Sequence, residues 1–128
     1  MTEPSDFAQA AAALIGAKYV KTDPTETELY RKDWRGRYAG EALAVVFPAD
    51  AGEVAALLKL CSERGLPVVP QAGNTGLVGG AIPSESGRAV LINVSRMDRI
   101  RETDIANNSV TVEAGCILAN LRDHADRH

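Results

Sequence analysis

The segment from Ala42 to Val69 constrains the fold of this 128-residue chain more than any other. It opens with ALAVVF (42–47), a continuous apolar run closed by Pro48, which is typical of a strand buried on both faces. A helix signal follows, and Leu66 to Val69 indicates a second strand. A strand, a helix and a strand within about thirty residues predict a βαβ unit with parallel strands and a right-handed crossover.

The helix between these strands carries signals at both ends. Asp50 is a good N-cap, and Glu53 follows at the spacing of a capping box. Gly65 stands where a glycine commonly ends a helix. Apolar residues recur at helical spacing between them: Val54, Leu57, Leu58 and Cys61. We therefore expect one face of this helix to be buried.

The N-terminal forty residues give weaker signals. SDFAQAAAALI (5–15) predicts a helix that Ser5 caps and Gly16 ends. The segment 18–40 is polar and is expected to be irregular, with Asp23-Pro24 as a turn signal.

The pattern changes after the third predicted strand, AVLINV (89–94). Ile100, Ile105 and the run 110–113 indicate short antiparallel strands, with a hairpin turn at Asn107-Asn108 because Asn tolerates positive φ. A helix is expected from Gly115, with an apolar face formed by Ile117, Leu118 and Leu121.

The predicted fold class is therefore α+β. Residues 1–95 form a first subdomain, a small parallel β-sheet flanked by helices. Residues 96–128 form the start of a mostly antiparallel second subdomain.

A glycine-rich loop follows the second strand, in the sequence VVPQAGNTGLVGGAIP (68–83). Four of the eight residues from Gly73 to Gly80 are glycine. Strand ends in open α/β sheets face ligand sites, and successive free N–H groups form concavities that bind anions. Asn74 and Thr75 add short side-chain donors. The loop predicts a ligand that carries phosphate or pyrophosphate; a flexible connection without a ligand is the alternative.

The loop matches neither common nucleotide-binding motif. A P-loop needs Gly-Lys-Ser/Thr, and no lysine follows here. The dinucleotide fingerprint G-x-G-x-x-G opens a helix, whereas Pro83 and Ser84 stand where that helix would run. The ligand is therefore expected to bind extended backbone, without the help of a helix N-terminus.

Composition excludes several classes of function. The net charge of −3 and the absence of a Lys/Arg cluster argue against a nucleic-acid partner. The start MTEPSDFAQA lacks the pattern of a signal peptide, and the apolar runs are too short to span a membrane. Cys61 and Cys116, both in helix-like patterns, are expected to be buried thiols, which favours a reducing cytoplasm.

Five separated elements resemble the FAD-linked oxidases of the vanillyl-alcohol oxidase and p-cresol methylhydroxylase type. Within that type they are most similar to the FAD-dependent D-2-hydroxy-acid dehydrogenases, which act on D-lactate, D-2-hydroxyglutarate or glycolate. The elements are VVFP (45–48), the helix 53–65, PVVPQAGNTGLVGGAIP (67–83), AVLINVSRMDRI (89–100) and VTVEAGCILANL (110–121). DWRGRY (33–38) also resembles the stretch before the first strand in bacterial members.

The resemblance implies a flavin-domain fold with FAD between the two subdomains and its pyrophosphate in the loop 70–83. Thr75 stands where some members carry a histidine that binds FAD covalently, so non-covalent FAD is expected. The residues implied to contact the cofactor are Pro70, Gln71, Ala72, Gly73, Asn74, Thr75, Gly76, Leu77, Gly79 and Gly80 in the loop, and Glu113, Ala114 and Gly115 near the flavin.

The resemblance also implies the parent reaction, the oxidation of a D-2-hydroxy acid to a 2-keto acid. Its catalytic residues, metal ligands and substrate domain would follow later in the parent sequence, so no catalytic residue is predicted here. The chain is expected to be a truncated N-terminal part that is inactive alone. There are two alternatives. The chain is a non-catalytic module that self-associates into a homo-oligomer, or it is a module that binds another phosphate ligand.

Two features outside the loop have a structural and a functional interpretation. Trp34, the only tryptophan, is expected to pack as a local anchor rather than to stack on a ligand or a partner domain. His124 and His128 share a helix face but have no third ligand in sight, so a solvated helix end is favoured over a metal site.

Overall fold

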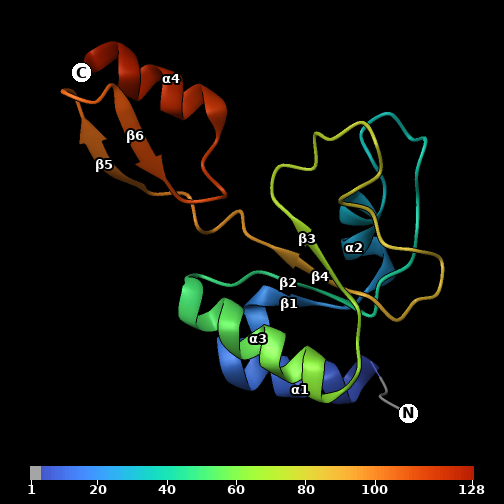
Figure 1. Ribbon diagram of the computed structural model, residues 1–128. Helices are drawn as coiled ribbons and strands as arrows, with labels where there is room; N and C mark the ends of the chain where they lie inside the picture. The colour runs from blue at the N-terminus through green and yellow to red at the C-terminus, as the bar shows by residue number, and fades with distance from the viewer. Residues whose placement is uncertain (1–3) are drawn as a thin grey trace.

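A four-stranded sheet organises the first part of the chain, in a computed structural model that describes residues 4–128 (Figure 1). The helices are α1 (Pro4–Ile15), the 3-10 helix η1 (Ala17–Tyr19), α2 (Pro24–Arg31), α3 (Ala51–Glu63) and α4 (Leu118–Arg127). The strands are β1 (Val20–Lys21), β2 (Ala44–Val46), β3 (Val68–Gln71), β4 (Val90–Asn93), β5 (Ile100–Asp104) and β6 (Ser109–Val112).

The sheet has the strand order β1-β2-β4-β3. β4 pairs in parallel with both β2 and β3, and β1 adds an antiparallel edge strand to β2. The parallel β2–α3–β3 unit is thus confirmed. Its two strands are not neighbours, because β4 lies between them.

Both faces of the central strands are buried, as their continuous apolar runs predicted. On one face α1 and α3 pack side by side against β2 and β4 (Figure 1). This core contains Phe7, Ala11, Ile15, Ala44, Val46, Leu57, Cys61, Val90 and Ile92. On the other face Val45, Phe47 and Leu91 contact Tyr30 of α2. Side chains alternate along β2, so Ala44 and Val46 pack in one core and Val45 packs in the other.

The predicted ends of α3 are confirmed. Asp50 Oδ1 accepts a hydrogen bond from the N–H of Glu53 at 2.8 Å, and Glu53 Oε1 accepts one from the N–H of Ala49 at 2.9 Å. Gly65, with φ +62°, follows the helix in a conformation that favours glycine. These local contacts fix where the helix begins and ends.

The prediction of an irregular segment 18–40 is wrong, because this segment contains η1, β1 and α2. Asp23-Pro24 begins a helix rather than a turn: the Asp23 carboxylate accepts from the N–H of Thr25 at 2.8 Å, and Pro24 is the first helical residue. Ser5 lies in the first turn of α1 instead of capping it, since that helix begins at Pro4. Gly16 ends α1 with φ +97°, as predicted.

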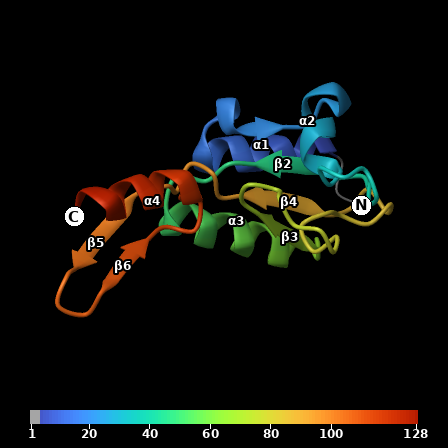
Figure 2. The same cartoon turned by 90° about the horizontal axis from the view of Figure 1, so that it is seen from above.

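The last thirty residues form a second unit at one end of the molecule, beyond the four-stranded sheet (Figure 2). β5 and β6 form an antiparallel hairpin, and Asn108 adopts the predicted positive φ of +51° in its turn. Ile105 lies in this turn and not in a strand. The final helix begins at Leu118 rather than near Gly115, so Cys116 precedes it, and the expectation of a helical Cys116 is wrong.

Arg96 joins the two units. Its guanidinium lies over the Tyr19 ring, 3.3 Å from the centroid, and donates a hydrogen bond to the Phe47 carbonyl at 2.7 Å. A carboxylate oxygen of Glu53 lies 3.8 Å away. The segment between the two sheets is therefore tied to η1, to the end of β2 and to α3. The subdomain boundary near residue 95 stays a prediction.

Candidate functional site

The glycine-rich loop leaves the sheet at the carboxyl end of β3, beside the carboxyl end of the parallel strand β4 (Figure 1). No helix or strand is present from residue 72 to residue 89. The sequence prediction of an extended loop without a following helix is confirmed. Pro70 and Gln71 belong to β3, so the loop itself begins at Ala72.

The loop backbone is open to contact. Within residues 4–128, no N–H group from Gly73 to Gly80 donates a hydrogen bond to a backbone carbonyl. A Cβ placed on Gly76 or Gly80 would meet nothing within 4 Å, and one on Gly73 would meet only Thr75 Cγ2 at 3.9 Å. None of these three glycines has positive φ. The described chain gives no steric reason for glycine at these positions, which fits a ligand that contacts the backbone.

Gly79 has a different explanation. Its φ is +77°, and a Cβ there would lie 3.1 Å from the Tyr38 ring. This glycine is therefore required by the conformation of the loop and by its contact with the segment after α2. Leu77, by contrast, is exposed at the loop surface.

Gln71 closes the loop at its base. Its buried carboxamide donates to the Tyr30 carbonyl at 2.8 Å and to the Ala81 carbonyl at 3.1 Å. It accepts from Asn93 Nδ2 at 2.9 Å, and Asn93 also donates to the Ala72 carbonyl at 3.2 Å. The two ends of the loop are thus linked through the side chains of the strands that carry it. The polar side chain of Gln71 is satisfied within the protein.

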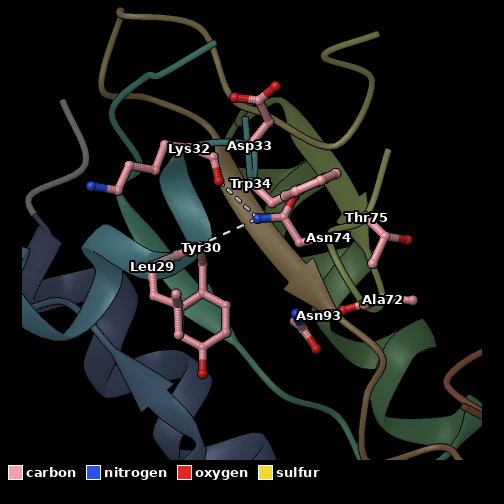
Figure 3. A pocket seen from close by; sticks show the side chains of 10 residues that line it. Leu29, Tyr30, Lys32, Asp33, Trp34, Ala72, Asn74, Thr75 and Asn93 are labelled. Carbon is pink, nitrogen blue, oxygen red and sulfur yellow. Dashed lines mark hydrogen bonds between the residues drawn. The ribbon is translucent and has the colours of Figure 1, made fainter. Parts of the chain in front are cut away.

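Asn74 ties the loop to the end of α2. Its φ is +54°, and its Nδ2 donates to the Lys32 carbonyl at 2.8 Å and, less closely, to the Leu29 carbonyl at 3.5 Å (Figure 3). The Asn74 Nδ2 group is therefore engaged by carbonyls at the end of α2 and just after it, and contact of Asn74 with the cofactor stays a prediction. The Thr75 side chain lines a cavity beside it.

We call residues 29–41 the brace, because they support the loop at several points. Besides accepting from Gln71 and Asn74, this segment donates from the N–H of Glu41 to the Ser84 carbonyl at 3.0 Å. Gly40 packs directly against the Pro83 carbonyl, where a Cβ would collide. The loop conformation therefore depends on residues that lie 41 to 45 positions earlier in the sequence.

The brace and the loop enclose a cavity of about 490 Å³ (Figure 3). Its walls are Leu29, Tyr30, Lys32, Asp33, Trp34, Ala72, Gly73, Asn74, Thr75 and Asn93. Sequence reasoning assigned none of the wall residues outside the loop to the site, and it considered ligand stacking only for Trp34. Trp34 was expected to pack locally, but it is 70% exposed. For the sheet side of the cavity a signal was available: the polar residue Asn93 ends the otherwise apolar strand β4.

The cationic side chain in the cavity wall, Lys32, is paired outside the cavity. The Lys32 ammonium lies 3.0 Å from a Glu28 carboxylate oxygen and points away from Asn74 and Trp34 (Figure 3). The hydrogen bond from Lys32 holds the pKa of Glu28 below its usual range. An anion at the loop would therefore be bound mainly by backbone N–H groups.

The second predicted segment, Glu113 to Gly115, follows β6. The Glu113 carboxylate is buried and accepts from Arg101 at 2.9 Å and from Arg99 at 3.4 Å. These hydrogen bonds, first from Arg101 and then from Arg99, lower its pKa. Gly115 lies so close to the Val94 carbonyl that a Cβ would collide, while Ala114 is exposed. Their proximity to the flavin stays a prediction.

No metal site is evident in the described part of the chain, where no three His, Cys, Asp or Glu residues come together. The His124 and His128 rings stack with centroids 4.2 Å apart, and His124 Nε2 lies 2.7 Å from Thr103 Oγ1. No helix among the described residues is long and apolar enough to cross a bilayer.

A mostly parallel sheet whose carboxyl edge carries an open, braced glycine loop is typical of domains that bind a phosphate-bearing ligand. The family model of the FAD binding domain matches residues 42–128, which is more than half of the chain. The chain therefore belongs to this family, and its cofactor is FAD.

Known proteins support this assignment. The chain is 37% identical over 122 residues to a probable mitochondrial D-2-hydroxyglutarate dehydrogenase of Oryza sativa subsp. indica, covering 95% of this chain and 22% of that protein. It is 41% identical over 102 residues to the quinone-dependent D-lactate dehydrogenase of Haemophilus influenzae, covering 77% of this chain and 17% of that protein. The resemblance to D-2-hydroxy-acid dehydrogenases is confirmed, and the chain spans about a fifth of their length.

The fold is also found in a solved protein structure. The structure of p-cresol methylhydroxylase with bound substrate superposes with a TM-score of 0.79 at 20% identity, covering 98% of this chain and 25% of that one. This likeness confirms the predicted α+β flavin-domain fold.

Proposed function

We propose that this chain holds the pyrophosphate of FAD in the loop 72–81 and belongs to an enzyme that oxidises a D-2-hydroxy acid to a 2-keto acid. Two relatives named for D-2-hydroxyglutarate and D-lactate support this substrate class. Bound flavin would supply the chemistry by accepting the hydride from the substrate. The chain's own part is to bind and orient the cofactor.

One observation carries the proposal: a run of free N–H groups lies beside glycines that nothing in the described chain requires. A diphosphate needs several donors and close access to the backbone, and this loop offers both. Backbone N–H groups would therefore bind the diphosphate without a charged side chain. The brace holds the donors in place before the ligand arrives, which lowers the entropy cost of binding.

Gly76→Ala in the intact protein tests the proposal. The new methyl group meets no protein atom and the φ of Gly76 is not positive, so the thermal midpoint should stay close to that of the wild type. FAD affinity, measured by flavin absorbance and fluorescence titration, should fall because the methyl group occupies the place of the ligand.

Val78→Ala is the matched control. Val78 lies in the same loop and is 84% exposed, and its replacement adds no atom to the backbone. It should leave FAD affinity unchanged. An intact wild-type protein that binds no FAD, or a Gly76→Ala variant that binds it with unchanged affinity, would contradict the proposed pyrophosphate site.

The FAD is proposed to be non-covalent. Thr75 lines the cavity at the position implied for a flavin-linked histidine, and its hydroxyl is a far weaker nucleophile than an imidazole. Acid precipitation of the loaded protein should therefore release all of the flavin into the supernatant. Flavin retained in the washed precipitate would contradict this.

A cytoplasmic location is also proposed. Cys61 and Cys116 are both unpaired in the structure, which fits a reducing compartment. No nucleic-acid partner is proposed, because the net charge is −3. Fractionation of the source cells would test the location directly.

Self-association is a second candidate, favoured by one surface. Ile117 and Leu118, which are adjacent at the start of α4, are 62% and 59% exposed. Adjacent exposed apolar residues favour an interaction surface. Size-exclusion chromatography with light scattering should show a homo-oligomer that Leu118→Ser weakens; a monomer at all concentrations would exclude this candidate.

A further inference from the structure

Trp34 is presented to solvent by a fixed turn. The buried Asp33 accepts from the N–H of Tyr38 through Oδ1 at 3.1 Å, and donates its own N–H to the Tyr38 carbonyl at 3.1 Å. Its carbonyl accepts from the N–H of Gly36 at 3.0 Å, and Gly36 has φ +73°. The turn is thus built by hydrogen bonds on both sides of the tryptophan, which is nonetheless 70% exposed.

The Trp34 ring lies on the side of the brace that faces the glycine loop. It lines the same cavity as Ala72, Gly73 and Thr75, and it extends toward the side where Thr75 lies (Figure 3). Tyr30 lines this cavity too, and its ring is fixed by an edge-to-face contact with Phe47 at 5.2 Å between centroids. Two aromatic rings and Leu29 therefore give the cavity an apolar wall opposite the open backbone.

The wall and the loop suit different parts of a nucleotide. The free N–H groups of the loop suit the diphosphate, whereas the Trp34 side has no cation turned inward, since the Lys32 ammonium points away (Figure 3). Aromatic faces bind flat rings by stacking. The volume of about 490 Å³ is in the range of small-molecule sites.

We propose that Trp34 contacts a planar ring of the flavin nucleotide whose diphosphate lies on the glycine loop. The inference rests on the proposed function and assigns part of the cofactor site to residues before the segment that matches the family. The ring is either the adenine or the flavin, and two fragments of FAD distinguish them.

Three variants of the intact protein test the contact by FAD titration. Trp34→Ala should raise the dissociation constant about ten-fold, the order expected for losing one stacked ring. Trp34→Phe should keep the affinity close to that of the wild type, and Trp34→Leu, which is apolar but not aromatic, should resemble Trp34→Ala. Leu58→Ala is the control, because Leu58 is 45% exposed on α3, on the opposite face of the sheet, and should change nothing.

The outcomes separate the inference from the proposed function. Wild-type affinity in Trp34→Ala, together with weak binding in Gly76→Ala, would overturn the stacking role and leave the pyrophosphate site standing. Equal affinity in Trp34→Leu and the wild type would overturn the aromatic contact. A wild-type protein that binds no FAD would overturn both.

Titration with ADP and with riboflavin 5′-phosphate identifies the ring. Stacking on adenine predicts that Trp34→Ala weakens ADP about ten-fold and leaves riboflavin phosphate unchanged, and stacking on the flavin predicts the reverse. If Trp34→Ala binds both ADP and riboflavin 5′-phosphate as tightly as the wild type does, the proposal is contradicted.

Discussion

The side chains of Gln71 and Asn93 hydrogen-bond to each other at 2.9 Å across the neighbouring parallel strands β3 and β4, where the two residues are paired in register. Both side chains are buried, and both also bond to the loop backbone. This pair therefore links the sheet to both ends of the loop and fixes where the loop lies relative to the strands.

Gln71→Ala should destabilise the protein by about 2 kcal/mol, because it leaves the partly buried carbonyls of Tyr30 and Ala81 without this donor and the buried Asn93 amide without its acceptor. Urea denaturation followed by circular dichroism measures the change. Gln9→Ala, the same substitution at an exposed position of α1, should shift stability by less than about 0.5 kcal/mol. Equal effects at the two positions would show that the buried network contributes nothing.

Asn74 combines two roles that substitutions can separate. Asn74→Gly keeps the positive φ and removes the donor to Lys32, whereas Asn74→Ala loses the donor and also replaces a residue that tolerates the left-handed region by one that does not, at a cost of up to about 1–2 kcal/mol. Both should weaken FAD binding, and Asn74→Ala should also lower the free energy of unfolding.

Asn108→Ala is the control for Asn74. Its φ of +51° imposes the same backbone strain in the distant hairpin turn, so the variant should lose stability by a similar amount and keep its FAD affinity. If Asn108→Ala weakened FAD as much as Asn74→Ala, loss of stability alone would account for both.

Gly40→Ala should prevent the brace from docking on the loop, because its Cβ would overlap the carbonyl of Pro83. We expect a loss of stability of more than about 2 kcal/mol by thermal or urea unfolding, in line with overpacking at a rigid backbone contact. The same glycine-to-alanine change at Gly76, where nothing lies within 4 Å, should leave stability nearly unchanged. A mild effect at Gly40 would mean that the brace and the loop move apart easily.

Glu113 predicts a defined pH dependence of stability. Arg101 and Arg99 lower its pKa in the folded state, so its contribution is present above the unfolded pKa and is lost as pH falls through the folded value. The wild type should therefore lose stability below about pH 4.5, and Glu113→Gln should flatten this part of the curve. Glu102→Gln, at an exposed position of β5, should keep the wild-type profile. Urea midpoints measured between about pH 3 and 6 provide the test.

The parts of the fold that sequence predicted are those with strong local signals. The cap at Asp50, the glycine at Gly65 and the apolar runs of β2 and β4 each reflect chemistry within a few residues. The helix α2 was missed because Asp-Pro serves equally as a turn and as a helix start. Its few apolar residues give no clear stripe, so only packing against the sheet decides between the two.

The site was predicted in part for the same reason. The glycine loop is a contiguous motif, whereas the brace meets it only through long-range contacts, such as that of Asn74 with Lys32. Trp34 was assigned to local packing because large apolar residues are usually buried. Its exposure follows from a turn fixed by Asp33 and Gly36, which no local pattern in the sequence specifies.

The brace also bears on how this domain is dissected. The segment that matches the family begins at residue 42, whereas the carbonyl groups that hold Gln71 and Asn74 lie before it. A truncated protein that begins at residue 42 would retain every glycine of the loop but would lack the brace, residues 29–41. Such a minimal domain would have to order its loop around the ligand, so recognition would become slower and weaker although every donor to the diphosphate remained.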